Sequence, residues 1–512
     1  MTTMKDRPQG DSHKAAVHPV DEFLAPQKLV VLGLQHLFIM YAGAVAVPLI
    51  VGGALGLKAE DIAILVSADL LVSGIATLIQ SIGIRSILGV RLPVVAGATF
   101  TVLNPMIIIA GQYGLPAVYG AMLCAGVFGL IIAKPFSAMI RFFPPLVTGT
   151  VITIIGLSLV GADAGLITGK GQGDNPTSNL PFVPFQPGVT VTDGDFKQTT
   201  TYGGSASITP HDYGLVSHIA LAGLVILVMI LIARFFKGFI GQISVLIGII
   251  VGTLVAWPMG LLDFSAVHGS KWVGIAEPFH FGHPKFVAAA IISMCIVILV
   301  TYTESTADML AVAEMVDRPL TSNDLARGLA TDGLSALLAG FMNSFPDTAY
   351  AENVGLIEIT KIKSRWVVAT CGLFLTILGL IPKMGAVVAG LPGPVIGGAG
   401  TVMFAMVTAI GIRTLNKVEY EDNHNLLIIA VSLSVGMLPV IAPDFYRHFP
   451  NNFQTIFGSA ITSTVVVVFM LNLVFNHWVR KPKQDSLMDT ALDAGAVTNQ
   501  PASGVPNTVI DG

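Results

Sequence analysis

The chain contains about fourteen apolar stretches between Leu29 and Trp478, each close to the roughly 20 residues that a helix needs to cross a bilayer. Of its 512 residues, 53% are hydrophobic and only 11% are charged, whereas soluble domains carry about a quarter charged residues. The sequence therefore predicts an all-α polytopic membrane protein without a large soluble domain. The predicted spans are 29–51, 60–82, 92–108, 112–133, 145–167, 215–235, 238–262, 286–313, 325–341, 344–360, 366–382, 386–411, 424–442 and 453–477.

Lys and Arg residues gather in the tails and in alternate loops, which predicts a cell-membrane protein with both termini in the cytoplasm. The polar tail 1–28 lacks the apolar core and cleavage site of a signal peptide, so the first span would direct insertion. Loop 168–213 would be an external, mobile or lightly structured lid, and 481–512 a disordered cytoplasmic tail. No long basic tract is present, so nucleic acid is not a predicted partner.

Two of the fourteen windows, 93–105 and 345–360, are interrupted by small and polar residues. They are the third segments of two sets of seven, which make up residues 29–262 and 286–477. Because seven is odd, the two sets would have opposite orientations, as a 7+7 inverted repeat. Matching interrupted segments of this kind point to a transporter site near the bilayer midplane. The alternative is a pair of re-entrant loops that bind no ligand.

Several acidic residues fall inside apolar windows, where each would cost roughly 2.5 to 3.5 kcal/mol in lipid. Glu304 and Asp308 lie four residues apart on one helix face, and Asp332 and Glu352 follow in the next two windows. These groups must face one another, a cavity or a ligand. For Glu304 and Glu352 we favour a functional role, whereas Asp308 and Asp332 could equally tie backbone ends together. Single polar groups occur elsewhere in the windows: His36, Asp69 and Asp163.

The residue types suit a small planar heterocycle as ligand. Carboxylates accept hydrogen bonds from ring N–H groups and can carry protons. Asn353 adds donors and an acceptor, and Phe100 in the other interrupted window offers a flat surface for a ring. The three cysteines, Cys124, Cys295 and Cys371, lie in apolar windows, which indicates packing residues and no metal site.

The sequence Glu352-Asn353-Val354-Gly355, followed by Thr360 and Lys361, resembles the signature of the nucleobase–ascorbate transporters, or nucleobase:cation symporters of the second kind. That signature is Gln, Glu or Pro, then Asn-x-Gly, four variable residues, Thr, and Arg, Lys or Gly. Gln35-His36 and Glu304-Ser305 with Asp308 are similar to other landmarks of the family. The resemblance covers residues 29 to 478.

The resemblance implies a core domain of spans 1–4 and 8–11, a gate domain of spans 5–7 and 12–14, and short strands in segments 3 and 10. It implies that Glu304 and Glu352 contact the substrate, and we place Asn353, Phe100 and Thr99 beside them. Asp308, Asp332 and His36 would support the site or proton coupling. We expect no cofactor, a proton as coupling ion with sodium as an open alternative, and a homodimer formed through the gate domain.

The stretches 343–366 and 397–404 look most like bacterial xanthine and uric acid permeases. That subgroup has Gln at the first signature position, whereas this chain has Glu352, as uracil permeases do; Asp347 is also unusual for the subgroup. The sequence therefore predicts a proton-coupled importer of xanthine or uric acid, with uracil as the alternative. An anion carrier of the related fourteen-span architecture, a membrane-embedded enzyme and a channel are the disfavoured alternatives, since carboxylates dominate the midplane and no nucleophile with a base is evident.

Overall fold

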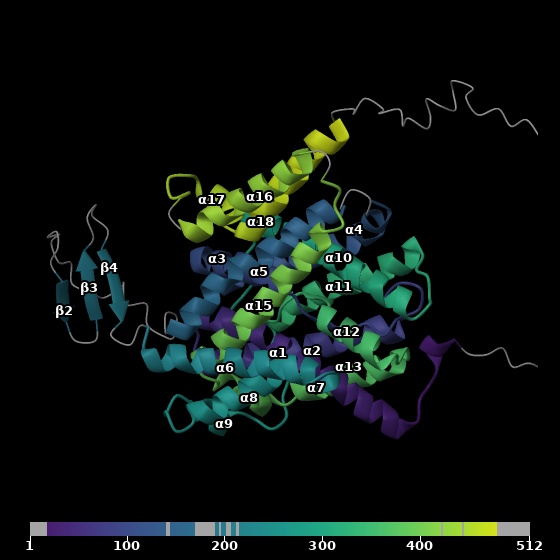
Figure 1. Cartoon of the computed structure of the whole chain (residues 1–512), viewed down its shortest axis with the longest axis horizontal. Helices are drawn as coiled ribbons and strands as arrows, with labels where there is room; N and C mark the ends of the chain where they lie inside the picture. The colour runs from purple at the N-terminus through teal and green to yellow at the C-terminus, as the bar shows by residue number, and fades with distance from the viewer. Residues whose placement is uncertain are drawn as a thin grey trace, which may run out of the picture.

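The structure, a computed structural model, describes residues 18–139, 144–168, 190–193, 196–200, 206–210, 214–420, 423–442 and 445–478. Helices form most of it, and Figure 1 shows them gathered into one body. The first half contains α1 (Pro26–Ala54), α2 (Ala59–Ile82), β1 (Ala96–Ala98), η2 (Phe100–Val102), α3 (Leu103–Tyr113), α4 (Leu115–Met139), α5 (Pro145–Thr168), β2 (Thr190–Asp193), β3 (Phe196–Thr200), β4 (Ala206–Pro210), α6 (Val216–Phe235), α7 (Phe239–Gln242), α8 (Ser244–Ala256) and α9 (Ser265–Gly269). The second half contains α10 (Ala288–Met315), α11 (Ser322–Met342), β5 (Asp347–Ala349), α12 (Ala351–Thr360), α13 (Arg365–Gly379), α14 (Pro382–Ala389), α15 (Gly393–Leu415), α16 (Asn423–Ile441), α17 (Asn451–Phe457) and α18 (Ala460–Asn472).

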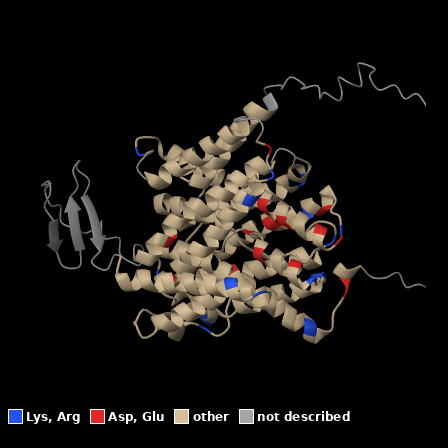
Figure 2. Ribbon diagram, viewed as in Figure 1, with Lys and Arg blue, Asp and Glu red and all other residues tan. Residues whose placement is uncertain are grey.

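Within the described residues, eight helices are long and apolar enough to cross a membrane, and two bent pairs bring the number to ten. Most of the helical body carries no charged residue (Figure 2). Of the remaining segments, α11 has 21 residues but is less apolar than the candidate spans. Helices α3, α8 and α12 have 11, 13 and 10 residues, too few for a bilayer at 1.5 Å per residue. Each of the fourteen predicted segments contains a helix, but 92–108 and 344–360 also contain the strands β1 and β5, so they are not fourteen comparable spans.

The predicted boundary between segments 366–382 and 386–411 is wrong. Helix α13 ends at Gly379, the chain bends by 81° into α14, and α15 begins only at Gly393. Prolines cause these breaks: Pro382 lies in the first turn of α14, and Pro392 precedes α15, positions where proline favours the start of a helix. Hydropathy did not show the break because α13 and α14 together are long and apolar enough for one span.

The second half repeats the element order of the first half: two helices, a strand with a short helix, and four further helical segments. The short strands that the family resemblance implied are present as β1 and β5, and they pair antiparallel with Ala96 opposite Ala349 and Ala98 opposite Asp347. The 7+7 inverted repeat itself stays a prediction.

The helices pack as two groups. One group surrounds the β1–β5 pair, and in the other α5 and α15 cross closely in the middle of Figure 1. The first group contains α1, α2, α4, α10, α11, α13 and α14, and the second contains α5, α6, α8, α15, α16 and α18. Glycines permit the closest crossings: a Cβ on Gly156 of α5 would lie 2.1 Å from Thr408 Oγ1 of α15, and one on Gly126 of α4 would lie 2.5 Å from the Leu337 amide of α11.

The N-terminal segment is anchored, which differs from the prediction of a plain tail over residues 1–28. Asp21, in the short turn η1 (Pro19–Asp21), pairs with Arg318 at 3.2 Å and with Arg365 at 2.7 Å. Phe23 packs edge-on against Trp366, and α1 already begins at Pro26. The N-terminal turn is therefore fixed to the loop that follows α10 and to the start of α13.

The predicted external loop 168–213 contains the antiparallel sheet β2–β3–β4, which the sequence analysis did not predict. The remainder of that loop and the tail 481–512 lie outside the described residues. The three cysteines are free; Cys371 is buried and the other two are half-buried, in agreement with their prediction as packing residues.

Candidate functional site

The two interrupted segments meet at the centre of the first helix group. Beyond the β1–β5 pairing, the Thr99 amide donates to Pro346 O at 3.0 Å and the Tyr350 amide donates to Val95 O at 2.9 Å. Each strand therefore leads directly into a short helix, η2 with α3 on one side and α12 on the other. Helix starts leave backbone N–H groups free for a ligand.

Glu304 of α10 is held by the first of these segments. Thr101 Oγ1 donates to one carboxylate oxygen at 2.8 Å, and Thr99 Oγ1 donates to the other at 3.2 Å. Thr99 Oγ1 also accepts from the Thr101 amide at 3.2 Å, which fixes the turn. Both oxygens of Glu304 are thus oriented by residues more than 200 positions away in the sequence, so the carboxylate has one defined direction.

A cavity of about 130 Å³ lies beside Glu304, between the strands and the α5–α15 pair. This volume suits one small ring compound, because pockets for drug-sized ligands hold roughly 300 to 1,000 Å³. Its charged side chains are the half-buried Glu304, Asp308 and Glu352. The remaining lining residues are Ala98, Thr99, Phe100, Ile152, Ile155, Ala307, Thr348, Ala349, Tyr350, Ala351, Val407, Ile410 and Thr414.

Phe100 forms part of the cavity wall and is supported from behind. Its ring meets that of Phe404 of α15 edge-on, with centroids 5.2 Å apart and an interplanar angle of 89°. Phe100 thus lies on the cavity wall, where we predicted that its ring offers a flat surface to a ligand. The contact with Phe404 also connects the first helix group to the second.

Asn353 and His36 lie together behind the cavity. Asn353 Nδ2 donates to His36 O at 2.9 Å and lies 3.1 Å from His36 Nδ1, and both residues are buried. Neither residue lines the cavity. Their contact joins α12 to α1, so in this conformation Asn353 positions the helix that carries Glu352.

Asp332 is also remote from the cavity. It is buried in α11, and its Oδ1 accepts from Gln80 Nε2 of α2 at 3.0 Å. Asp308, by contrast, lies on the cavity wall with Glu304 and Glu352, whose charges act on it. Of the four predicted acidic residues, Glu304, Asp308 and Glu352 therefore line the cavity, whereas Asp332 does not.

The later signature residues shape the end of α12. Gly355 faces Gln242, with a Cβ there 3.3 Å from Nε2. Thr360 Oγ1 donates to Leu356 O at 2.8 Å, and Lys361 ends the helix with φ of +57°. A left-handed conformation excludes β-branched residues and favours glycine, which explains why the signature accepts Gly or an unbranched Arg or Lys there.

Sequence reasoning missed Thr101, Tyr350 and the wall that α5 and α15 provide. Thr101 lies two residues from Thr99, and a search for hydroxyls near the interrupted segment would have found it. Ile152, Val407 and the other residues on α5 and α15 belong to regular apolar spans, in which the sequence gives no signal of a cavity.

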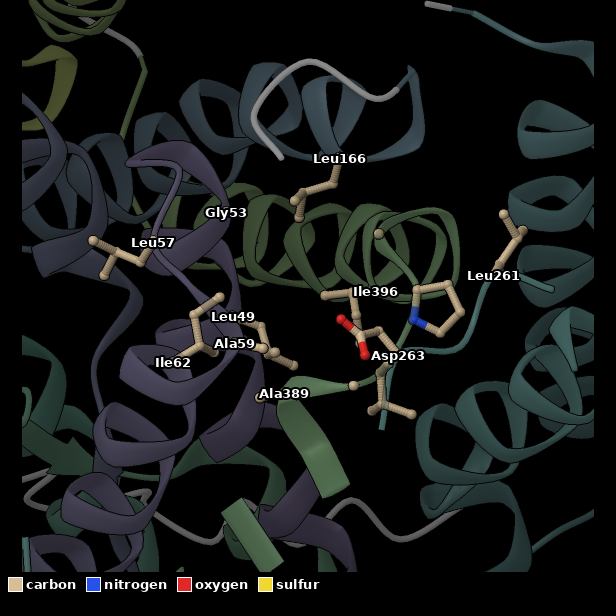
Figure 3. Close-up of a pocket in the computed structure, with 14 residues that line it drawn as sticks. Leu49, Gly53, Leu57, Ala59, Ile62, Leu166, Leu261, Asp263, Ala389 and Ile396 are labelled. Carbon is tan, nitrogen blue, oxygen red and sulfur yellow. The ribbon is translucent and has the colours of Figure 1, made fainter. Parts of the chain in front are cut away.

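A second cavity, of about 290 Å³, lies at the ends of α1 and α5 next to the α14–α15 break. Figure 3 shows it between Leu49, Leu57 and Ile62 on one side and Leu261 and Asp263 on the other. Among the described residues that line it, Asp263 alone has a polar side chain, and the pKa of this carboxyl is lowered by hydrogen bonds from the hydroxyl and amide of Ser265. With a single exposed carboxylate, it is a weaker candidate than the cavity at Glu304.

Comparison with known proteins decides the family. A family model described as a permease family, Xan_ur_permease, matches residues 27–191 and 198–445. The chain belongs to this family, the nucleobase–ascorbate transporters. It is 39% identical over 92% of its length to the uric acid transporter UacT of Escherichia coli, covering 91% of that protein. It is 37% identical over 92% of its length to the xanthine permease of Bacillus subtilis, covering 99% of that protein. As a permease-family member, the chain is a transporter and not an enzyme.

Solved structures show the same fold. The transmembrane domain of the cyanobacterial bicarbonate transporter BicA matches with a TM-score of 0.50 at 11% identity, over 87% of this chain and 97% of that domain. The murine Slc26a9 anion transporter matches with a TM-score of 0.54 at 13% identity, over 92% of this chain and 73% of that protein. At such low identity the likeness concerns the fold alone.

Proposed function

We propose that the chain is a proton-coupled symporter that imports a nucleobase, with xanthine or uric acid as the first candidates and uracil as the second. The observation that carries this proposal is the small cavity in which Glu304, fixed by two threonines, lies with Glu352 and Phe100. The relatives named above, a uric acid transporter and a xanthine permease, support the same substrate class.

The chemistry of the cavity suits an N–H-rich ring. The carboxylates of Glu304 and Glu352 accept hydrogen bonds from ring N–H groups. The Phe100 face stacks on the ring, and helix starts at η2 and α12 supply N–H groups for ring carbonyls. The charged residues on the described cavity wall are all acidic. This composition disfavours the anion-carrier alternative, despite the fold likeness to anion transporters.

Transport would follow from relative movement of the two helix groups. We assign the group around the β1–β5 pair to the core domain and the α5–α15 group to the gate domain. The cavity lies between them, with Glu304 and Glu352 on the core side and Ile152 and Val407 on the gate side. The larger cavity at Asp263 lies at Leu166, near the C-terminal end of α5, which is the side that we assign to the exterior. Movement of the core would expose the bound base to each side in turn.

Protons are the proposed coupling ion, and sodium is the alternative. Glu304, Asp308 and Glu352 share a small space without a basic residue among the described wall residues, so protonation would relieve their repulsion and change the affinity for the base.

We also propose cytoplasmic termini, because Lys and Arg concentrate on that side. Homodimerisation would occur through the gate helices, of which α6 and α16 are largely exposed.

Uptake of labelled xanthine tests the substrate class. The assay uses cells without purine and pyrimidine permeases at acidic external pH, with excess unlabelled uric acid or uracil as competitor. Uptake blocked by uric acid but not by uracil would support the purine assignment. Accumulation of labelled uracil instead would support the alternative, and accumulation of neither base would contradict the proposed function.

The substitution Glu352→Gln tests whether this residue selects the base. Gln can donate as well as accept, whereas an ionised Glu only accepts, so the favoured ring edge should change. We expect the ratio of xanthine to uracil uptake to shift by about tenfold, since one hydrogen bond to a charged group contributes about 1.5 to 3 kcal/mol. Competition assays measure the ratio. An unchanged ratio would show that Glu352 does not determine specificity.

The substitution Thr101→Val tests the support of Glu304. Val keeps the volume but removes the hydroxyl that donates to Glu304 at 2.8 Å. The apparent KM for the base should rise by about tenfold or more, because a misoriented carboxylate loses its directed hydrogen bond. The control is Thr150→Val on α5, where the hydroxyl bonds only to Leu146 O of its own helix. Equal KM values for the two variants would refute the role of Thr101.

A further inference from the structure

Three carboxyl groups form a second acidic cluster behind the strands, away from the substrate cavity. Asp69 of α2, Asp332 of α11 and Asp347 of β5 are each at most 1% exposed, and none of them lines the cavity at Glu304. We call them the rear carboxyls. In the sequence Asp69 is a single polar group in an apolar window, and Asp347 is a residue unusual for the xanthine and uric acid permease subgroup.

Reciprocal hydrogen bonds bring Asp69 and Asp347 together. Ser73, one turn after Asp69 on α2, donates to Asp347 Oδ1 at 2.8 Å. Ser344, three residues before Asp347, lies with its hydroxyl 3.4 Å from Asp69 Oδ1. Each aspartate therefore lies beside the segment that carries the other, and their charges act on each other.

Each rear carboxyl keeps one oxygen without a partner. Asp69 Oδ2, Asp332 Oδ2 and Asp347 Oδ2 are buried and accept no hydrogen bond from the part of the chain that the structure describes. Burying an ionised carboxylate without a counter-charge is far more costly than burying a neutral one. Two adjacent buried carboxyls cannot both ionise, so such a pair holds a proton.

The cations on the surrounding elements are engaged elsewhere. Arg365 of α13 donates to carbonyls at the end of α2 and pairs with Asp21. Arg327 pairs with Asp324 at the start of α11, and Lys383 of α14 lies over Trp272. Within the described residues, two other titratable groups interact electrostatically with the rear carboxyls. They are Tyr302, next to Asp332, and Tyr350, next to Asp69 and Asp347. The other titratable groups on these elements include His36, which bonds to Asn353, and the cavity residues Glu304, Asp308 and Glu352.

Tyr350 connects the two acidic groups. It lines the substrate cavity but is only 4% exposed, and its hydroxyl has no hydrogen-bond partner among the described residues. The charges of Glu352, Asp69 and Asp347 all act on this hydroxyl. Gly43 of α1 makes room for it, since a Cβ there would lie 2.0 Å from Oη. Tyr350 therefore borders the cavity and is also acted on by the rear carboxyls, and its hydroxyl can both donate and accept a hydrogen bond, as a proton carrier must.

We propose that the Asp69–Asp347 pair, with Asp332 beside it, is the binding site of the coupling proton, and that the Tyr350 hydroxyl connects this site to Glu352. The inference rests on the proposed proton-coupled function. One proton taken up from the exterior is held on the pair while the base occupies the cavity, and the same proton leaves to the cytoplasm after the base. The bound ion is assigned as a proton because two neighbouring buried carboxyls that cannot both ionise hold one.

The test uses the full-length protein in liposomes with the base that the uptake assay selects, xanthine or uracil. Asp347→Asn keeps the shape and an oxygen that can accept from Ser73, but it cannot bind and release the proton. We expect exchange of labelled for unlabelled base to stay within about twofold of the wild type, because the pair lies outside the cavity. Proton movement with the base and accumulation driven by a pH gradient should be lost.

Asp163→Asn is the matched control. Asp163 of α5 is fully buried and both of its oxygens are without a partner in the described structure, but it lies in the other helix group. This variant should keep proton-driven accumulation. If Asp347→Asn does not yield a folded protein, Asp69→Asn, which also lies outside the cavity, should show the same separation of exchange from accumulation.

Three outcomes would overturn the inference. In the first, Asp347→Asn or its substitute moves protons with the base in the wild-type ratio. In the second, Asp163→Asn loses coupling as well, which would show that any buried carboxyl has this effect. In the third, a sodium gradient and not a pH gradient drives accumulation in the wild type. The third outcome would also refute the proposed proton coupling, whereas the first two leave it intact.

Discussion

Glu304→Gln is expected to abolish accumulation of the base while the protein remains in the membrane. The substitution removes the negative charge and replaces one acceptor oxygen with an NH2 group. Thr99 and Thr101 currently donate to the two oxygens of Glu304. In the variant, the hydroxyl of one threonine meets the NH2 group of Gln instead of an oxygen. The N–H group of the bound base also loses its negatively charged acceptor. Two charge-assisted hydrogen bonds of about 1.5 to 3 kcal/mol each correspond to a loss of at least about 100-fold in uptake.

Initial uptake rates at equal membrane abundance measure this effect. Glu314→Gln is the matched control, because Glu314 belongs to the same helix, α10, but is exposed near its end. The control should transport normally. Wild-type uptake by Glu304→Gln would contradict the assignment of the cavity as the substrate site.

Gly156→Leu should prevent stable folding of the gate helices. A Cβ at Gly156 would lie 2.1 Å from Thr408 Oγ1, 2.5 Å from Phe404 O and 2.6 Å from the Thr408 amide. Two of these atoms belong to the α15 backbone, so α5 and α15 would have to move apart along their whole crossing. Overpacking costs about 1 to 3 kcal/mol when side chains can adjust and more when the backbone cannot. The apparent Tm should fall by about 5 °C or more, or the folded protein should be absent.

Gly161→Leu, on the same helix, provides the control. A Cβ at Gly161 has no atom within 4 Å among the described residues. Leu also favours helix over Gly by nearly 1 kcal/mol, so this variant should be as stable as the wild type. Thermal denaturation of the purified proteins, followed by size-exclusion chromatography, compares the two. Equal Tm values would show that the α5–α15 crossing is less tight than described.

Much of the fold could be predicted because its causes are local. A run of about 20 apolar residues is sufficient for a membrane helix, and helices such as α1, α2, α5 and α6 begin and end within a few residues of their predictions. The α13–α14–α15 region could not be predicted in the same way. There the chain bends at prolines within an unbroken apolar stretch, and both a straight span and a bent one satisfy hydropathy.

The candidate site was predicted in part. An acidic residue in an apolar window must have a compensating environment, which predicted that the carboxyls of these windows face one another, a cavity or a ligand. In the structure Glu304, Asp308 and Glu352 line one cavity, and their roles stay predictions. The sequence could not distinguish these three residues from Asp332, which does not line the cavity and accepts a hydrogen bond from Gln80 instead. Nor could it find Thr101 or the apolar cavity wall, because ordinary threonines and isoleucines are frequent in every span.

Hydropathy and signature residues are properties of short stretches. They were therefore sufficient to predict that the chain spans a membrane, where two segments are interrupted, and which permease family it resembles. Which polar groups meet depends on the three-dimensional packing of the helices. The β1–β5 pairing joins residues about 250 positions apart, places Thr99 and Thr101 on Glu304, and divides the carboxyls between the substrate cavity and the Asp69–Asp347 pair. That division depends on the direction and packing of side chains from distant helices, which no local pattern specifies.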